Sequence, residues 1–375
     1  SEEAMPSKAS SIYYDIETKR IAWLDYVLSA VYVYDENGKF VKQMEPSDSE
    51  FEKFSKIDID TATYSMLKQN LLKVIYLKIL NLNDKTVQLI GSLPRLYMTV
   101  EGSDTSVDYS NEMCIIDKGI DSASTIVSTI KFPEELNKKG FFPKHVNIYT
   151  YDSMILLPVY KGWPVIGSKG FDSTNYSASY NPFVDSFYDY TPLFYAIDTR
   201  NDSIKIVGNL SQQFKDDKSG YYNYRPKFIA KDNRLYFHDG YSGYFLVYDK
   251  KFKIIDTLFC LPAKKGIVRN TYNSNNTEQT PLEYLNATRM DIDTKIVDLK
   301  VVGNRLLLLY QYRDVMLLNN YNLTDRTSSI YKIDDKTNST NKQNKYAISC
   351  TQDKALVTKV YDGIAKISFT KYIQL

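Results

Sequence analysis

The stretch VYVYDENGKFV at residues 31–41 decides the fold, because its layout returns as YFLVYDKKFKII at residues 244–255. In both stretches an apolar and aromatic run ends in Asp, crosses a short polar turn and continues as a second run. Runs of this composition predict short antiparallel strands joined by a tight turn. A hairpin that recurs along a chain is the sequence signature of a repeat architecture.

The same layout recurs at four other places, so that the closing residues of the modules are Asp35, Asn83, Asp117, Asp198, Asp249 and Asp334. Between residues 226 and 261 four strand-like runs follow one another with only turns between them. Four short antiparallel strands are the blade of a β-propeller. The sequence therefore predicts an all-β propeller with seven blades, and six or eight blades stay open as alternatives.

Hairpin fragments at the two chain ends predict that the termini share a closing blade, which would leave no open sheet edge. We expect a flexible segment at residues 1–11 and a single propeller domain at residues 12–375. Insertions without a strand period are expected near residues 161–192 and 263–289. A pair of β-sandwich domains would explain the short strands, but not why one hairpin recurs with no linker.

Charge and composition bear on several classes of partner. The net charge of +2 comes from 47 basic and 45 acidic side chains that are interleaved, so we expect no nucleic-acid partner. The sequence contains no run of 18 apolar residues, so it predicts no transmembrane segment. Cys114, Cys260 and Cys350 lack metal-ligand spacing, so we expect no metal and no cofactor, while one disulfide remains open.

Catalytic chemistry has few candidate residues. A nucleophilic site that needs histidine must use His145 or His238, the only two in the chain. His238 precedes a glycine turn, where it is either a site residue on a propeller face or a turn residue. Paired carboxylates in a central channel would support a glycoside hydrolase or lyase, but the sequence identifies no pair.

Aromatic residues give the strongest binding signal, because Tyr-rich loops with Asn, Ser and Gly make adaptable contact surfaces with rigid anchors. The alternative is that these rings fold back and plug the propeller face. The residues that we predict to bind a ligand are Trp163, Tyr176, Tyr180, Phe183, Phe187, Tyr188, Tyr190, Tyr222, Tyr224, Arg225 and His238.

The Tyr-rich hairpins at residues 31–41 and 244–255 resemble those of propeller lipoproteins from gut Bacteroidetes, a domain-of-unknown-function family of TolB-like or six-bladed-propeller type. The resemblance implies an exported protein in the periplasm or at the outer membrane, anchored by lipid on an N-terminal cysteine that has been removed. We also expect a monomer. The resemblance implies no catalytic residues. We therefore expect a non-enzymatic binding or scaffold protein whose ligand is a glycan or a protein.

Overall fold

The computed structural model divides into two compact units, which we describe separately. Unit 1 comprises Ser1–Gly162 and Phe194–Ile206, and unit 2 comprises Trp163–Leu193 and Val207–Leu375. The single domain expected at 12–375 stays a prediction, and the segment 1–8 with most of both expected insertions lies outside the described residues. The structure describes residues 9–15, 17–25, 28–47, 74–92, 95–98, 105–108, 112–120, 125–132, 141–143, 148–161, 181–201, 203–261, 283, 294–313, 315–334, 344–350, 354–361 and 367–374.

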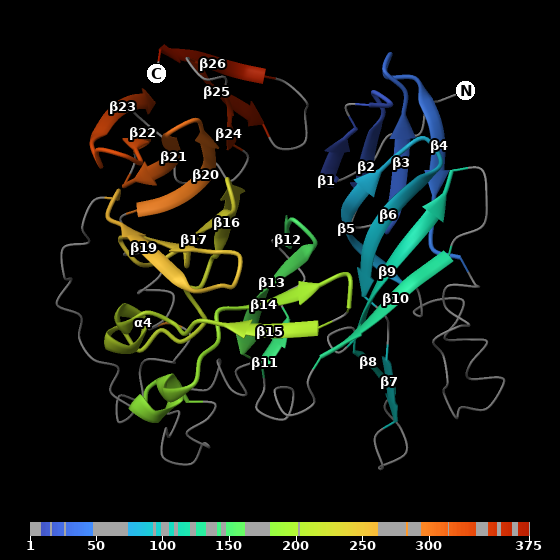
Figure 1. Ribbon diagram of the computed structural model, residues 1–375, viewed down its shortest axis with the longest axis horizontal. Helices are drawn as coiled ribbons and strands as arrows, with labels where there is room; N and C mark the ends of the chain where they lie inside the picture. The colour runs from blue at the N-terminus through green and yellow to red at the C-terminus, as the bar shows by residue number, and fades with distance from the viewer. Residues whose placement is uncertain are drawn as a thin grey trace. The chain divides into compact units, whose positions relative to one another are not determined.

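Unit 1 contains three large antiparallel sheets and one small hairpin (Figure 1). The first sheet runs β1 (Ala9–Tyr14), β2 (Ile21–Asp25), β3 (Ala30–Tyr34), β4 (Phe40–Met44). The second runs β5 (Ile75–Leu82), β6 (Thr86–Ser92), β9 (Glu112–Gly119), β10 (Thr125–Lys131). The third runs β11 (Phe141–Pro143), β13 (Met154–Lys161), β14 (Phe194–Asp198), β15 (Ser203–Val207), with β12 (Tyr149–Tyr151) also on β13. The hairpin is β7 (Arg95–Met98) and β8 (Thr105–Asp108).

Unit 2 contains three further antiparallel sheets, each in chain order. They are β16 (Lys227–Lys231), β17 (Arg234–His238), β18 (Phe245–Tyr248), β19 (Ile254–Leu258); β20 (Thr294–Val302), β21 (Arg305–Tyr312), β22 (Val315–Asn322), β23 (Ser328–Asp334); and β24 (Asn344–Cys350), β25 (Lys354–Tyr361), β26 (Ile367–Gln374). Two short helices precede them, η3 (Asp185–Asp189) and α4 (Gln212–Asp216).

The predicted all-β fold with four-stranded antiparallel blades is confirmed: among the described residues, four of the six larger sheets have four strands, one has five and one has three. The sequence counted the hairpins that end at Asn83 and Asp117 as two modules, which is wrong. Both lie in one sheet, since β6 pairs with β9 and the β7–β8 hairpin is inserted between them. A local pattern marks each hairpin, but it does not tell which hairpins pair.

The expected closing blade with strands from both termini is not found in the described part of the chain. β1 pairs with β2, whereas β26 pairs with β25 in the sheet that starts at β24. Each terminal strand therefore completes a sheet built from its own end of the chain.

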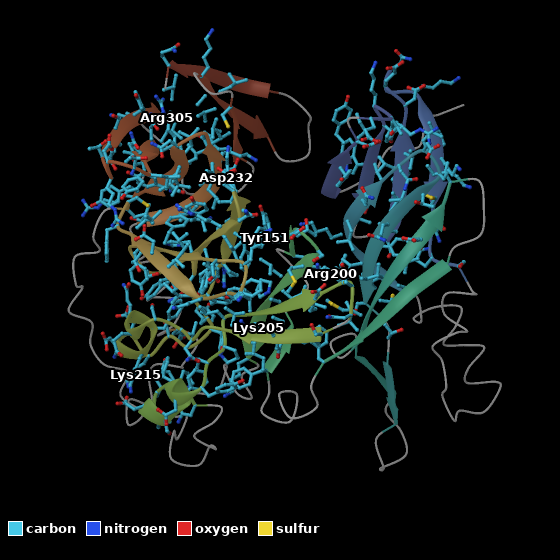
Figure 2. All side chains as sticks on the ribbon, in the orientation of Figure 1. Tyr151, Arg200, Lys205, Lys215, Asp232 and Arg305 are labelled. Carbon is cyan, nitrogen blue, oxygen red and sulfur yellow. The ribbon has the colours of Figure 1, made fainter. Side chains whose placement is uncertain are left out.

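Several inner strands are buried on both faces, and β21 is a clear case. The run from Leu306 to Tyr310 is fully buried, although successive side chains point to opposite faces. Leu306, Leu308 and Tyr310 pack in a core shared with the β16–β19 sheet. Leu307 and Leu309 pack in a core shared with the β24–β26 sheet. Side chains thus pack on both faces of this sheet, whose strand β21 begins at Arg305, labelled in Figure 2.

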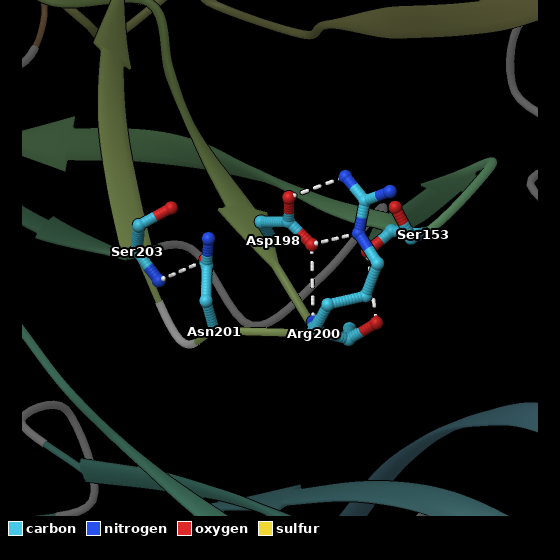
Figure 3. A network of polar contacts seen from close by, with 6 residues as sticks. Ser153, Asp198, Arg200, Asn201 and Ser203 are labelled. Carbon is cyan, nitrogen blue, oxygen red and sulfur yellow. Dashed lines mark hydrogen bonds and ion pairs between the residues drawn. The ribbon is translucent and has the colours of Figure 1, made fainter.

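The Asp residues that end the hairpin strands build the turns. Oδ1 of Asp249 accepts hydrogen bonds from the backbone N–H of Lys251 at 2.9 Å and Lys253 at 2.8 Å. Asp35 binds the N–H groups two and four residues further on in the same way, at 2.9 Å each. Asp198 uses the same oxygen for the N–H of Arg200 and also holds the Arg200 guanidinium (Figure 3). These carboxylates are Asx-turn residues, so the Asp that recurs at the end of the hairpin strands is explained by the turns that it stabilises.

The first strand of a sheet contacts the first strand of the next sheet within each unit: β1 contacts β5, β16 contacts β20, and β20 contacts β24. Polar side chains link the sheets there. Ser29 Oγ accepts from the N–H of Tyr76 at 2.8 Å and donates to the carbonyl of Val74 at 3.1 Å. Lys227 Nζ lies 3.4 Å from the carbonyl of Val297, which is freed from pairing by a bulge in β20.

Replacing Asp249 with Ala tests the turn assignment. We expect a loss of about 1 kcal/mol in unfolding free energy, because two backbone N–H groups exchange a carboxylate for water. Asp249→Asn keeps an acceptor oxygen and should lose less than half as much. Urea unfolding followed by circular dichroism measures both, and equal losses in the two variants would contradict the assignment.

Tyr310 makes stability depend on alkaline pH. Its hydroxyl is buried without a hydrogen-bond partner among the described residues, and burial raises its pKa to about 12. Above pH 10 the unfolded chain loses this proton while the folded chain keeps it, so stability falls as pH rises. Tyr310→Phe should gain about 1 kcal/mol at neutral pH, because a buried unpaired hydroxyl is removed.

The same variant should lose less stability between pH 10 and 11.5 than the unmodified protein, measured by urea unfolding at each pH. Tyr14→Phe, on an exposed ring of β1, is the control and should change neither quantity. A parallel loss in the Tyr310→Phe variant would refute this explanation.

Candidate functional site

The described part of the predicted aromatic site lies in unit 2, in a segment that we call the aromatic module, residues 181–193 and 207–225. It carries η3 and α4 and is tied together by the backbone. The N–H of Leu193 donates to the carbonyl of Val207 at 2.9 Å, and the N–H of Leu210 donates to that of Thr191 at 3.0 Å. The two parts of the module therefore form one layer, although β14 and most of β15 separate them in sequence.

The base of the aromatic module is a row of buried rings. Phe187, Tyr221, Tyr224 and Phe214 follow one another edge to face, with ring centroids 5.7 to 6.4 Å apart, and Phe214 reaches Tyr241 at 4.8 Å. Edge-to-face pairs contribute about 0.5–1.5 kcal/mol beyond burial. Phe187 and Tyr224, which the sequence predicted to bind a ligand, therefore lie in a buried layer of packed rings.

The buried tyrosines donate hydrogen bonds into the layer. The Tyr221 hydroxyl donates to the carbonyl of Pro192 at 2.6 Å, and the Tyr224 hydroxyl donates to that of Leu193 at 2.5 Å. Burial raises the pKa of Tyr224 well above its usual value, so the group stays a neutral donor. Each ring therefore has a fixed position and a satisfied polar end.

The rim of the aromatic module is accessible. Phe183, Tyr188 and Tyr222 are half-buried, and Tyr190 is 40% exposed. Gly220 N–H donates to the Tyr188 hydroxyl at 3.0 Å, and Lys218 lies over the Tyr188 ring at 5.9 Å. Rings that are fixed by contacts within the module and remain partly exposed make a contact surface that loses little conformational entropy on binding.

Charged residues also line this rim. Asp185 at the start of η3 forms ion pairs with Lys218 and, at 3.7 Å, with Lys215 at the end of α4. Lys215 is labelled in Figure 2. The hydrogen bond and charge of Lys218 lower the pKa of Asp185. η3 and α4 are thus joined by charge beside the half-buried rings.

His238 is a turn residue in the structure. Its Nδ1 accepts a hydrogen bond from the Gly240 N–H at 2.7 Å, so the proton sits on Nε2, which donates to the Ser242 carbonyl at 2.7 Å. Both ring nitrogens are occupied by the backbone of one turn. In this geometry the imidazole has no nitrogen available as a general base.

Asp239 beside it is occupied in the same turn. Its Oδ1 accepts from the N–H groups of Tyr241 and Ser242 at 2.8 and 2.7 Å, and Oδ2 accepts from the Ser242 hydroxyl at 2.7 Å. A cavity of about 30 Å³ adjoins Asp239 and Ser242. This volume holds one or two water molecules and excludes a sugar ring.

The structure thus separates the predicted ligand-binding residues into three groups. Phe187, Tyr224 and His238 are buried supports, while the rim holds Phe183, Tyr188, Tyr190, Tyr222 and the half-buried Arg225. Trp163, Tyr176 and Tyr180 lie outside the described residues. The sequence did not single out Phe214 or Tyr241 as parts of the layer, because one lies in a polar helix and the other in a glycine turn.

The cysteines and acids of the described residues suggest no reactive centre. The three cysteines are free thiols, and burial raises the pKa of Cys260 to about 12 and that of Cys350 in the same direction. The described side chains contain no group of three or more metal-ligating residues. In the first strands of the six sheets the described residues include one acid, Asp298, so the paired carboxylates of a glycoside hydrolase are not placed there.

No protein-family model and no curated protein matches the chain. Among solved structures, the chain is similar to a member of the DUF4221 family from Bacteroides vulgatus, with a TM-score of 0.53 and 10% identity over 100% of this chain and 95% of that one. A weaker likeness, with a TM-score of 0.45 and 10% identity, links it to virginiamycin B lyase from Staphylococcus aureus over 99% of this chain and 85% of that one.

A prolyl endopeptidase is similar with a TM-score of 0.47 and 9% identity over 98% of this chain, which spans only 42% of that enzyme's length. At such identities likeness concerns the fold alone. With the sheet topology, the comparisons define the class of the protein as a β-propeller. No helix in the described ranges is long and apolar enough to cross a membrane.

Gly240 offers a sharp test of the turn that holds His238. It has φ +86°, and a Cβ there would lie 2.4 Å from the Arg225 carbonyl oxygen. Gly240→Ala should cost more than 2 kcal/mol, from backbone strain and the clash. Gly243→Ala in the same turn meets nothing within 4 Å and should cost less than 0.5 kcal/mol. Thermal unfolding compares the two, and similar costs would contradict this geometry.

Proposed function

We propose that this protein is a non-enzymatic binding or scaffold propeller, and that its ligand, a glycan or a protein, contacts the rim of the aromatic module. The observation that carries the proposal is the contrast between the buried row of rings and the exposed Tyr190 beside half-buried Phe183, Tyr188 and Tyr222. Preorganised tyrosine rings stack on sugars or fill protein pockets at little cost in conformational entropy. From the sequence alone, the proposal extends this surface to Trp163, Tyr176 and Tyr180.

The alternative, a carbohydrate-active enzyme, finds less support. It needs two carboxylates about 5–5.5 Å or 6.5–9.5 Å apart. The acid described on the first strands, Asp298, binds the N–H groups of Ile348 and Leu299 with its two oxygens. A hydrolysis screen of the pure protein on neutral and acidic oligosaccharides separates the two functions, because turnover would reject the binding role.

We also propose that the protein acts in the periplasm or at the outer membrane of a bacterium, as a lipid-anchored monomer. This rests on the resemblance of its Tyr-rich hairpins to those of Bacteroidetes propeller lipoproteins. Recovery of the native protein in the cytoplasmic fraction of its source cell would reject the location.

The rim predicts a separable mutant. Tyr190→Ala combined with Tyr222→Ala should reduce binding at least tenfold, because each ring of a contact surface contributes about 1 kcal/mol or more. Stability should change by less than 1 kcal/mol, since neither ring belongs to the buried row. The assay is a glycan array together with capture from an envelope extract, followed by titration of the retained ligand.

The matched control is Tyr14→Ala, which removes an exposed ring in unit 1. It should leave binding unchanged. If the control and the double variant bind equally well, the rim of the aromatic module is not the binding surface.

A further inference from the structure

The first strands of unit 2 carry lysines on successive sheets. β16 contacts β20, and β20 contacts β24. β16 carries Lys227 and Lys231, and β20 carries Lys295 and Lys300. We call these four residues the lysine cluster; it is separate from the aromatic module.

The register of β16 turns its two lysines toward the next sheet. Lys227, Ile229 and Lys231 share one face of the strand, and Ile229 packs in the core that the β16–β19 and β20–β23 sheets share. Lys231 therefore lies on the side of β16 that faces β20.

The register of β20 continues this arrangement toward β24. Lys300 pairs with Leu307 and Asp298 pairs with Leu309, and both leucines belong to the core shared with the β24–β26 sheet. Lys295 is on the same side, because the bulge at Val297 resets the alternation. The lysines of β16 thus face β20, and those of β20 face β24.

Asp298, which lies on β20 with two of these lysines, accepts hydrogen bonds from the backbone. Asp298 Oδ2 accepts from the N–H of Ile348 on β24 at 2.8 Å, and Oδ1 accepts from the N–H of Leu299 at 2.8 Å. Within the described residues, none of the four lysines forms an ion pair. Among the described residues of β16 and β20, the four lysines are accompanied by one acid, Asp298.

Electrostatic coupling supports the proximity of these groups. Burial lowers the pKa of Lys227, with Asp298 opposing the shift and Lys295 adding to it. Burial raises the pKa of Cys350 on β24, and the charges of Lys300, Asp298 and Lys231 also act on this thiol. The charges of lysines on both β16 and β20 therefore affect the pKa of the Cys350 thiol.

We propose that the lysine cluster binds a small multivalent oxyanion, one that carries phosphate groups or several carboxylates. Ammonium groups from two strands and a partly desolvated setting favour a ligand with several charged oxygens. A neutral sugar would leave the positive charges without a counterion. The inference does not depend on the proposed role of the aromatic module.

Titration calorimetry with tripolyphosphate and with tri-galacturonate tests the proposal. We expect saturable binding of at least one probe, and the tighter one assigns phosphate or carboxylate chemistry. Lys231→Gln and Lys300→Gln should each weaken binding about tenfold, because each removes a charged hydrogen-bond donor. The matched control is Lys253→Gln, which removes an exposed lysine of the same unit and should change the affinity less than twofold.

Cys350 provides a second readout on the unmodified protein, because it is partly exposed while Cys114 and Cys260 are buried. The dianionic reagent DTNB should label Cys350 faster, relative to neutral dithiodipyridine, in the unmodified protein than in Lys300→Gln. Tripolyphosphate should slow the reaction with DTNB. The effect of tripolyphosphate is measured on the unmodified protein, so this readout does not depend on the folding of any variant.

Absence of saturable binding to both probes would overturn the proposal. So would an equal loss of affinity in Lys253→Gln, since that would indicate nonspecific attraction. A loss confined to Lys231→Gln and Lys300→Gln, with protection of Cys350, would establish the site even if the aromatic rim binds nothing.

Discussion

The burial of inner strands such as β21 on both faces is the constraint on which the rest of the structure depends. A strand such as β21 cannot leave either face in water, because each buried leucine contributes about 1.5–3 kcal/mol. The sheet must therefore be covered on two sides, and the β16–β19 and β24–β26 sheets cover it. Stacking of one sheet on the next within a unit follows from this double burial, and it leaves polar residues to the turns, outer strands and first strands.

The same constraint explains why residues that look catalytic are structural here. A stack of short strands needs many tight turns, and each turn needs side-chain acceptors for its own N–H groups. Asp35 and Asp249 use the same oxygen on the same backbone positions, although 214 residues separate them in the chain. His238 and Asp239 serve one turn in a similar way. In a repeat protein, a conspicuous Asp or His must first be tested against the turn that it terminates.

The sequence predicted the strands, their hairpins and the propeller class, because period-two burial and Asx turns are local and therefore visible in a linear pattern. It failed where the outcome depends on which strand pairs with which. The pairing of β6 with β9 across an inserted hairpin leaves no local mark. For the aromatic module, the composition identified the region but not which rings form the buried base and which form the rim. Tyr224 and Tyr222 are alike in sequence, and only the hydrogen bond to Leu193 and the contacts with Phe214 make Tyr224 a buried support.

The presence of lysines on the first strands is not explained by a contribution to the stability of the fold. Burial lowers the pKa of Lys78 in unit 1 to about 8, and it lowers that of Lys227 in unit 2. A lowered lysine pKa means that the charged form is destabilised in the fold, so an apolar side chain of similar length would stabilise these positions more. Lys78 and Lys227 each reach a carbonyl near a neighbouring strand, which offsets part of this cost. Lys231 and Lys300 form no ion pair within the described residues, and a bound anion would give each of them a counterion.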